Sequence, residues 1–188
     1  MGAESEKKVL DPYRFTVEEY HRMADAGIFS GNERVELLNG EIICMSPINS
    51  PHAACVDCLT EWFILYFHKK AIIRVQNPIR LDVYSEPEPD LVVAGLKPDK
   101  YKSGHPVPNE VMLVIEVADS SLDKDRSVKL PKYSYVGIAE AWLINLERQE
   151  VEVHTQPAET GYSKLKVFRI GQVIETSLVA GLPVEDIF

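Results

Sequence analysis

Hydrophobic residues recur at two characteristic spacings along this chain, and the helical spacing is clearest over residues 50–70. Apolar residues there lie three and four positions apart, which predicts a long helix with one buried face. It begins with a serine followed by Pro51, a typical helix start. Upstream, Thr16 and Glu19 have the spacing of a capping box, which predicts a shorter helix that ends at Gly27.

Strand patterns fill much of the remaining chain. Residues 34–38, the pair Asn39-Gly40 and residues 41–43 predict a tight β-hairpin, because Asn-Gly is the strongest short signal for such a turn. Residues 111–117 are apolar without alternation, as expected for a strand covered on both faces. Further strands are predicted at residues 72–76, 79–83, 90–94, 140–146, 150–155 and 163–169, with a short strand, a turn and a final half-turn within 178–188.

Two other segments complete the predicted architecture. Residues 95–109 are polar and rich in proline, which predicts a long loop. A helix is predicted over residues 123–135, and Pro131 should shorten or kink it because proline lacks the amide hydrogen. The order of elements predicts an α/β fold, a central mixed sheet flanked by helices, in one domain over residues 14–188 after a flexible lead-in at 1–13.

The composition is that of an ordinary globular protein. Of the 188 residues, 45% are hydrophobic and 26% are charged. The N-terminus is polar, and the longest apolar run, residues 62–67, is too short to span a bilayer. We therefore expect a cytoplasmic protein without a membrane partner.

The three cysteines, Cys44, Cys55 and Cys58, do not indicate a disulfide framework, because their number is odd and no secretion signal is present. On a helix, His52, Cys55 and Cys58 would recur near one face, so a zinc site is one alternative. The favoured interpretation is that the cysteines are structural, because the neighbouring apolar residues form a core stripe.

The formal net charge of −9 argues against indiscriminate DNA binding, since non-specific affinity depends on neutralising phosphates with Lys and Arg. It does not exclude a nuclease, because a local basic strip can contact DNA and part of the acidic charge can belong to a metal site. The chain has neither a GxGxxG nor a GxxxxGK motif, so nothing here supports a nucleotide-binding or other small-molecule protein.

Two carboxylates at the ends of apolar strands are the strongest candidates for chemistry. Asp90 opens the segment 90–94, and Glu116 closes the apolar run 111–115. A buried ionised carboxylate needs a partner, and a divalent cation is one. If the two strands are neighbours, Asp90 and Glu116 can hold one Mg²⁺ or Mn²⁺, completed by a backbone carbonyl and waters. The alternative is that both acids simply face solvent.

A lysine beside such a metal could orient an attacking water or stabilise the transition state. Lys129 lies one helical turn after Asp125 and one turn before Tyr133, so these three residues share one helix face. Lys124 and Lys132 compete for the same role. Asp125 and Lys129 could equally form a simple surface pair.

An ordered set of short motifs resembles a known family. The motifs are FTVEEY at 15–20, RVELLNGE at 34–41, MSP at 45–47 with His52, EPD at 88–90, VIEV at 114–117, and the helix residues Asp125, Lys129 and Tyr133 followed by Gly137-Ile138 and Glu140-Ala141-Trp142. No single motif is specific, but the ordered set resembles the Uma-two family of restriction endonucleases, within the PD-(D/E)XK nuclease superfamily, from residue 15 to residue 188.

This resemblance implies a restriction-endonuclease-like core and a role for several residues by position. Asp90 and Glu116 are the implied metal ligands, with the carbonyl of Val117 as a third. Glu36 is implied as an additional acidic member of the catalytic site, although its alternation with apolar neighbours also allows it to face solvent. His52 matches a family position near the start of the second helix and is expected to support the metal ligands from outside.

One position departs from the superfamily pattern, which places a lysine two residues after the glutamate. That residue here is Ala118, so the lysine must come from the following helix. The resemblance favours Lys129 for this role, supported by Asp125 and Tyr133.

Two functions are compatible with these residues. The first is a Mg²⁺-dependent endonuclease that hydrolyses DNA by in-line attack of a metal-activated water, using Asp90, Glu116 and Lys129. The second is a catalytically inactive nuclease-fold protein that acts as a binding or assembly module, which the acidic charge and the absence of an evident basic stripe favour. A homodimer is expected from the apolar hairpins near the C-terminus, and two sites would assist cleavage of both strands.

Overall fold

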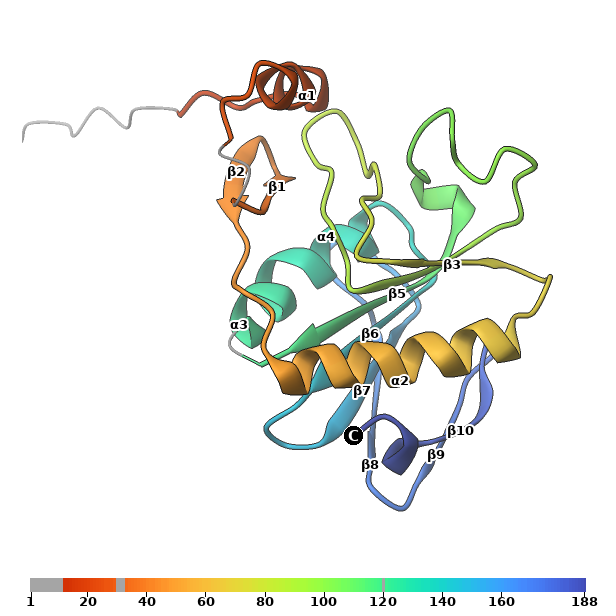
Figure 1. Cartoon of the computed structure of the whole chain (residues 1–188). Helices are drawn as coiled ribbons and strands as arrows, with labels where there is room; N and C mark the ends of the chain where they lie inside the picture. The colour runs from red at the N-terminus through yellow and green to blue at the C-terminus, as the bar shows by residue number, and fades with distance from the viewer. Residues whose placement is uncertain (1–11, 30–32, 120) are drawn as a thin grey trace, which may run out of the picture.

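Six strands form one mixed sheet at the centre of the protein (Figure 1). The structure, a computed structural model, describes residues 12–29, 33–119 and 121–188. In spatial order the strands are β3 (Ile72–Val75), β4 (Leu91–Ala94), β5 (Val111–Ala118), β6 (Glu140–Asn145), β7 (Glu150–Thr155) and β8 (Lys164–Arg169). β5 and β6 are parallel, and the other neighbouring pairs of this sheet are antiparallel. The predicted mixed sheet of an α/β fold is confirmed.

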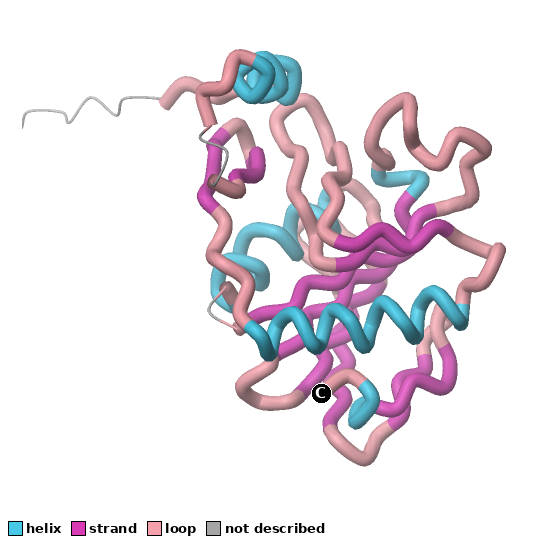
Figure 2. The backbone as a smooth tube through the Cα atoms, viewed as in Figure 1, coloured by secondary structure: helices cyan, strands magenta, loops and turns pink. Residues whose placement is uncertain are grey.

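Helices cover both faces of this sheet (Figure 2). One face carries α2 (Ser50–Tyr66), and the other carries a helical region made of α3 (Leu122–Lys124), a π-helical turn (Asp125–Lys129) and α4 (Leu130–Tyr135). The remaining elements are α1 (Val17–Asp25), the hairpin β1 (Val35–Leu38) and β2 (Glu41–Cys44), the pair β9 (Val173–Glu175) and β10 (Ala180–Pro183), and short 3₁₀ turns at Pro108–Glu110 and Val184–Asp186.

The core lies in two layers, one on each face of the sheet. Leu91 and Val93 pack with the buried side of α2, whereas Val92 and Ala94 pack in the cluster that contains residues of α4. Successive side chains of a strand point to opposite faces. This two-sided burial explains why β4 and β5 are continuously apolar, as the sequence predicted.

The N-cap of the first helix is the predicted residue, Thr16. The N-cap of the second helix lies one residue before the predicted serine. The backbone N–H of Thr16 donates to the Glu19 carboxylate at 2.9 Å, and the N–H of Glu19 donates to the Thr16 hydroxyl at 3.2 Å, which completes the capping box. The cap of α2 is Asn49, which accepts from the N–H of His52 at 3.0 Å. This helix ends at Tyr66, before the predicted end at residue 70.

The predicted strand at residues 79–83 is wrong. Ile79 and Leu81 are buried over the sheet face that carries α4, and their N–H groups bond to the carbonyls of Pro87 and Ser85 within the same loop. Their alternation therefore reflects a loop that buries every second side chain, without a partner strand. The short strand β9 was missed by the sequence analysis.

The helix predicted over residues 123–135 is present but changes geometry before Pro131. This proline has no N–H to donate to the carbonyl of Ser127, and its ring would crowd that carbonyl in a regular α-helix. The chain adopts a π-helical turn directly before α4, a geometry that occurs mostly as single turns near functional sites. Asp125 and Lys129, at its two ends, are both buried.

Two predictions remain, one about membrane-spanning helices and one about the N-terminal lead-in. In the part of the chain that the structure describes, no helix has the length and apolar character needed to cross a membrane. Residues 1–11 of the predicted flexible lead-in at 1–13 lie outside the described residues.

Candidate active site

Asp90 and Glu116 come from neighbouring strands. β4 pairs with β5 so that Leu91 lies opposite Ile115, and this register brings Asp90 to the level of Glu116. The condition that the sequence left open, that these two strands are neighbours, is met. Glu116 is not the strand end that the sequence predicted, because β5 continues for two more residues.

A cavity of about 80 Å³ lies beside these carboxylates. One water needs roughly 15 Å³ of such space, so several waters or a hydrated ion can enter. Asp90, Glu116 and Val117 all line the cavity, and so do other predicted site residues, namely His52, Asp125 and Lys129. The two implied ligand residues and Val117, the residue of the implied carbonyl donor, therefore line one space.

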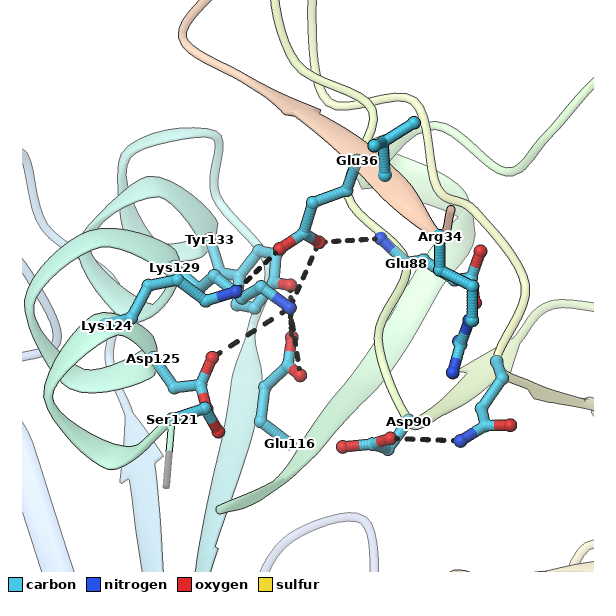
Figure 3. A network of polar contacts seen from close by, with 12 residues as sticks. Arg34, Glu36, Glu88, Asp90, Glu116, Ser121, Lys124, Asp125, Lys129 and Tyr133 are labelled. Atoms are coloured by element: carbon cyan, nitrogen blue, oxygen red, sulfur yellow. Dashed lines mark hydrogen bonds and ion pairs between the residues drawn. The ribbon is translucent and has the colours of Figure 1, made fainter. Parts of the chain in front are cut away.

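Glu116 is buried and held by two donors (Figure 3). The Lys129 ammonium lies 3.2 Å from its carboxylate, and the Tyr133 hydroxyl donates to Oε1 at 2.6 Å. Burial raises the pKa of Glu116 well above its usual range. Lys129 opposes this effect, while the negative charges of Asp125, Asp90 and Glu36 add to it.

Glu36, in β1 of the hairpin, contacts Lys129 as well. Its carboxylate lies 3.2 Å from Lys129 Nζ and 3.0 Å from Lys124 Nζ, and it accepts the backbone N–H of Glu88 at 3.2 Å. Burial favours the neutral acid, but Lys129 and Lys124 together lower the pKa of Glu36. The alternative that Glu36 faces solvent is wrong, since only 1% of the residue is exposed.

Asp90 is held in place by different groups. Its Oδ2 accepts the backbone N–H of Val117 at 2.8 Å, His52 Nε2 lies 3.2 Å away, and the Gln76 amide donates to Oδ1 at 3.4 Å. Burial would raise the pKa of Asp90, but His52 and the Val117 N–H lower it below its usual range. His52 therefore lies beside Asp90.

The structure separates the three competing lysines. Lys129 is 3% exposed and its Nζ also lies 3.9 Å from Asp125. Burial alone would lower the pKa of Lys129, but the three surrounding carboxylates raise it, so this side chain stays charged. Lys124 pairs with the other carboxylate oxygen of Glu36, Oε1, at 3.0 Å. Lys132 pairs instead with Asp82 at 2.6 Å. The position between Glu36 and Glu116 belongs to Lys129.

Three further contacts were missed by the sequence analysis. The Ser121 hydroxyl donates to Asp125 at 2.5 Å, and the Gln76 amide supports Asp90. Arg34 pairs with Glu88 at the cavity wall. Arg34 is the first residue of the motif RVELLNGE and Glu88 is the first residue of the motif EPD. Their positions in these motifs could have marked them as site residues. Gln76 is the last residue of the strand predicted at residues 72–76, and no pattern marks it as a site residue.

The side chains at the cavity include oxygen donors of the type that a hard divalent cation prefers. Glu36, Asp90, Glu116 and Asp125 carry four potential negative charges against the two ammonium groups of Lys124 and Lys129. Within the described ranges, no three or more His, Cys, Asp or Glu side chains form a group that could hold a metal. A metal here would therefore depend on Asp90, Glu116, the Val117 carbonyl and water, the oxygen donors that Mg²⁺ accepts.

The cysteines take no part in this site. Cys55 is buried in the core beneath α2, and burial raises the pKa of its thiol to about 12. Cys44 and Cys58 are exposed and free. The structural interpretation holds for Cys55, and the zinc alternative has no set of ligands among the residues that the structure describes.

Comparisons with known proteins identify a family and a fold. A family model named Uma2, described as "Putative restriction endonuclease", matches residues 17–185. Among solved structures, the chain is similar to "a putative nuclease belonging to DUF820 from Anabaena variabilis", with a TM-score of 0.73 and 16% sequence identity over 93% of this chain and 97% of that one. At this identity the likeness shows the fold alone. A comparison with curated proteins finds no match.

Proposed function

The chain belongs to the Uma2 family, and we propose that it is a Mg²⁺- or Mn²⁺-dependent endonuclease that hydrolyses DNA phosphodiester bonds. The observation that carries the proposal is the position of Lys129. Its buried ammonium lies 3.2 Å from both Glu36 and Glu116, at a cavity that Asp90 also lines. A lysine and two carboxylates at one cavity can hold a divalent cation, orient a water and stabilise charge on a phosphate.

Asp90 and Glu116, with the Val117 carbonyl, would hold the metal. When bound, a divalent cation lowers the pKa of a coordinated water and stabilises charge on a phosphate oxygen. The protein's own task is to keep both carboxylates in fixed positions. The Val117 N–H and His52 orient Asp90, and the Tyr133 hydroxyl orients Glu116.

Lys129 would stabilise charge on the phosphate or orient the attacking water. Glu36 and Asp125 keep its ammonium charged and limit its movement. Because the position two residues after Glu116 is Ala118, which has no charged group, the catalytic lysine is supplied by the π-helical turn. In this protein the helix following β5 therefore completes the site.

A second candidate function has its own supporting observation. The ammonium of Lys129 already contacts the carboxylates of both Glu36 and Glu116, as expected if the fold serves as a binding or assembly module without catalysis. Calorimetry with Mg²⁺ and Mn²⁺ separates the two functions, because the inactive module predicts no heat of metal binding.

The direct test is cleavage of plasmid and linear DNA with Mg²⁺ or Mn²⁺. We expect Asp90→Ala, Glu116→Gln and Lys129→Met to abolish cleavage. The matched controls Asp57→Ala and Glu61→Gln, on the exposed side of α2, should cleave like the wild type. Cleavage that survives unchanged in both Asp90→Ala and Glu116→Gln would overturn the proposed mechanism. The predicted homodimer and cytoplasmic location stay predictions, and sedimentation measures the first.

A further inference from the structure

A second group of charged residues lies on the sheet face that carries Glu116. The strand registers align Glu116 of β5 with Leu143 of β6, and Leu143 with Glu152 of β7. Glu150 lies two residues before Glu152 and therefore points to the same face. Both glutamates are buried, and both contact arginine side chains.

Three arginines form this group, which we call the arginine row. Arg126 in the π-helical turn pairs with Glu152. Arg169 at the end of β8 lies 3.0 Å from Glu150, and Arg148 in the β6–β7 turn lies 3.9 Å from the same carboxylate. Because β7 and β8 are antiparallel to their neighbours, this turn and the end of β8 lie at the sheet end where β5 finishes (Figure 1). The arginine row and the candidate site therefore share one end of the molecule.

The arginine row carries more positive charge than its glutamates neutralise. Three guanidinium groups face two carboxylates, which leaves an excess of one positive charge even with His154 neutral. The side chains of Arg126, Arg148 and Arg169 are 43%, 71% and 65% exposed. A guanidinium has five N–H donors, so one contact with a glutamate leaves further donors of each arginine available to a ligand.

Stability accounts for only part of this arrangement. The two buried glutamates need positive partners, but Arg126 and Arg169 already supply one for each. Arg148 is 71% exposed and lies 3.9 Å from Glu150, so this third contact adds only about 0–1 kcal/mol to the folded state. The glutamates do fix where the guanidinium groups lie. An arginine positioned in advance loses less side-chain freedom when it binds a ligand, and its planar donors match a phosphate group.

We infer that the arginine row binds phosphates of the DNA backbone beside the candidate site. This inference rests on the proposed function and names the surface through which an acidic protein can hold its substrate. Contacts to phosphates fix the position and register of a duplex but carry no sequence information. The row would therefore position DNA at the cavity without selecting a recognition sequence.

The test measures binding separately from cleavage. Fluorescence anisotropy with a labelled duplex, in Ca²⁺ to avoid cleavage, gives the affinity over a series of salt concentrations. The variant is Arg126→Gln/Arg148→Gln/Arg169→Gln. Its matched control, Arg22→Gln/Lys100→Gln/Lys102→Gln, removes three exposed charges from α1 and the loop after β4. Both triple variants change the net charge equally, so only a local contact distinguishes them.

We expect the slope of log affinity against log salt to fall by about 0.9 for each lost phosphate contact, or about 2.7 in the triple variant. The control should keep the wild-type slope. Arg148 makes the longest contact with a glutamate, so its loss should disturb the fold least, and the Arg148→Gln variant should fold normally. Its slope of log affinity against log salt should fall by about 0.9. Equal slopes in the wild type and the Arg148→Gln variant, or equal losses in both triple variants, would overturn the inference.

Parallel cleavage assays in Mg²⁺ distinguish this inference from the proposed function. DNA binding that depends on the arginine row without any cleavage would support the row and refute the nuclease. Cleavage by the wild type, with unchanged DNA binding and KM in the arginine variants, would support the nuclease and refute the role of the arginine row. A wild type that neither binds nor cleaves DNA would refute both.

Discussion

Replacing Lys129 by methionine tests whether the site is built around this one cation. Methionine keeps an unbranched side chain of similar length but removes the charge. Glu36 and Glu116 then face each other without the ammonium that lies 3.2 Å from each of them. Asp125 also loses its neighbour at 3.9 Å. We expect the variant to fold but to be much less stable than the wild type.

The magnitude follows from the geometry. At an effective dielectric constant of about 20, two unit charges 3.2 Å apart attract by about 5 kcal/mol. The cost of burying the ammonium offsets part of this attraction, so removing one partner of a buried pair typically costs about 3–5 kcal/mol. With a urea m-value of about 2 kcal/mol/M, the unfolding midpoint should fall by about 1.5–2.5 M.

Urea unfolding followed by circular dichroism at neutral pH measures this loss. Lys124→Met is the matched control, because Lys124 is more exposed than Lys129, and its loss should cost about 0–1 kcal/mol. The double variant Lys129→Met/Glu116→Gln removes one of the stranded charges and should recover at least about 1 kcal/mol relative to Lys129→Met. An unchanged midpoint in Lys129→Met, or simple additivity in the double variant, would refute the reasoning.

Three further predictions concern the surroundings of the site and the core. Tyr133→Phe removes the 2.6 Å hydrogen bond to Glu116 and should cost about 1.5–3 kcal/mol in urea unfolding; a loss below about 0.5 kcal/mol would mean that this bond is weak. Burial raises the folded-state pKa of Glu140, so its ionised form destabilises the protein near neutral pH, and that penalty disappears as the pH falls through the raised pKa. Glu140→Gln, which keeps an acceptor for the Trp142 N–H, should therefore be more stable than the wild type at pH 7 and show a shrinking advantage on acidification; a pH-independent difference in melting temperature would contradict this. Phe63→Ala, at a fully buried position of α2, should cost about 3–5 kcal/mol in the same unfolding assay, and a loss under 1 kcal/mol would show that the core there is not tightly packed.

Local patterns predicted most elements of the fold. The capping box of α1, the Asn39-Gly40 hairpin and the continuous apolar run of β5 each depend on neighbours in sequence, and each is present. The strand predicted at residues 79–83 failed because a loop that packs on a sheet can show the same alternation as a strand. Only the hydrogen-bond partners of Ile79 and Leu81 distinguish the two cases.

The candidate site was predictable as a list of residues but not as an arrangement. The sequence favoured Lys129 over Lys124 and Lys132 through the family resemblance and its spacing from Asp125 and Tyr133, but spacing does not show which lysine is buried. The structure decided by burial and direction, because Lys132 turns to Asp82 and Lys129 lies between two acids. Glu36 was equally ambiguous until the hairpin was placed beside Lys129 of the π-helical turn and the loop that contains Glu88.

By itself, the sequence determined which residues could perform chemistry and most of the segments that are helical or extended, because those properties depend on residue type and short-range spacing. It also showed that Ala118 cannot supply the lysine of the superfamily pattern. Only the tertiary structure decided that Asp90, Glu116, Glu36 and Lys129 meet. Their contacts join segments up to 93 residues apart in the chain, and such distant pairs form only when the register of β4 and β5, the hairpin and the π-helical turn are fixed together.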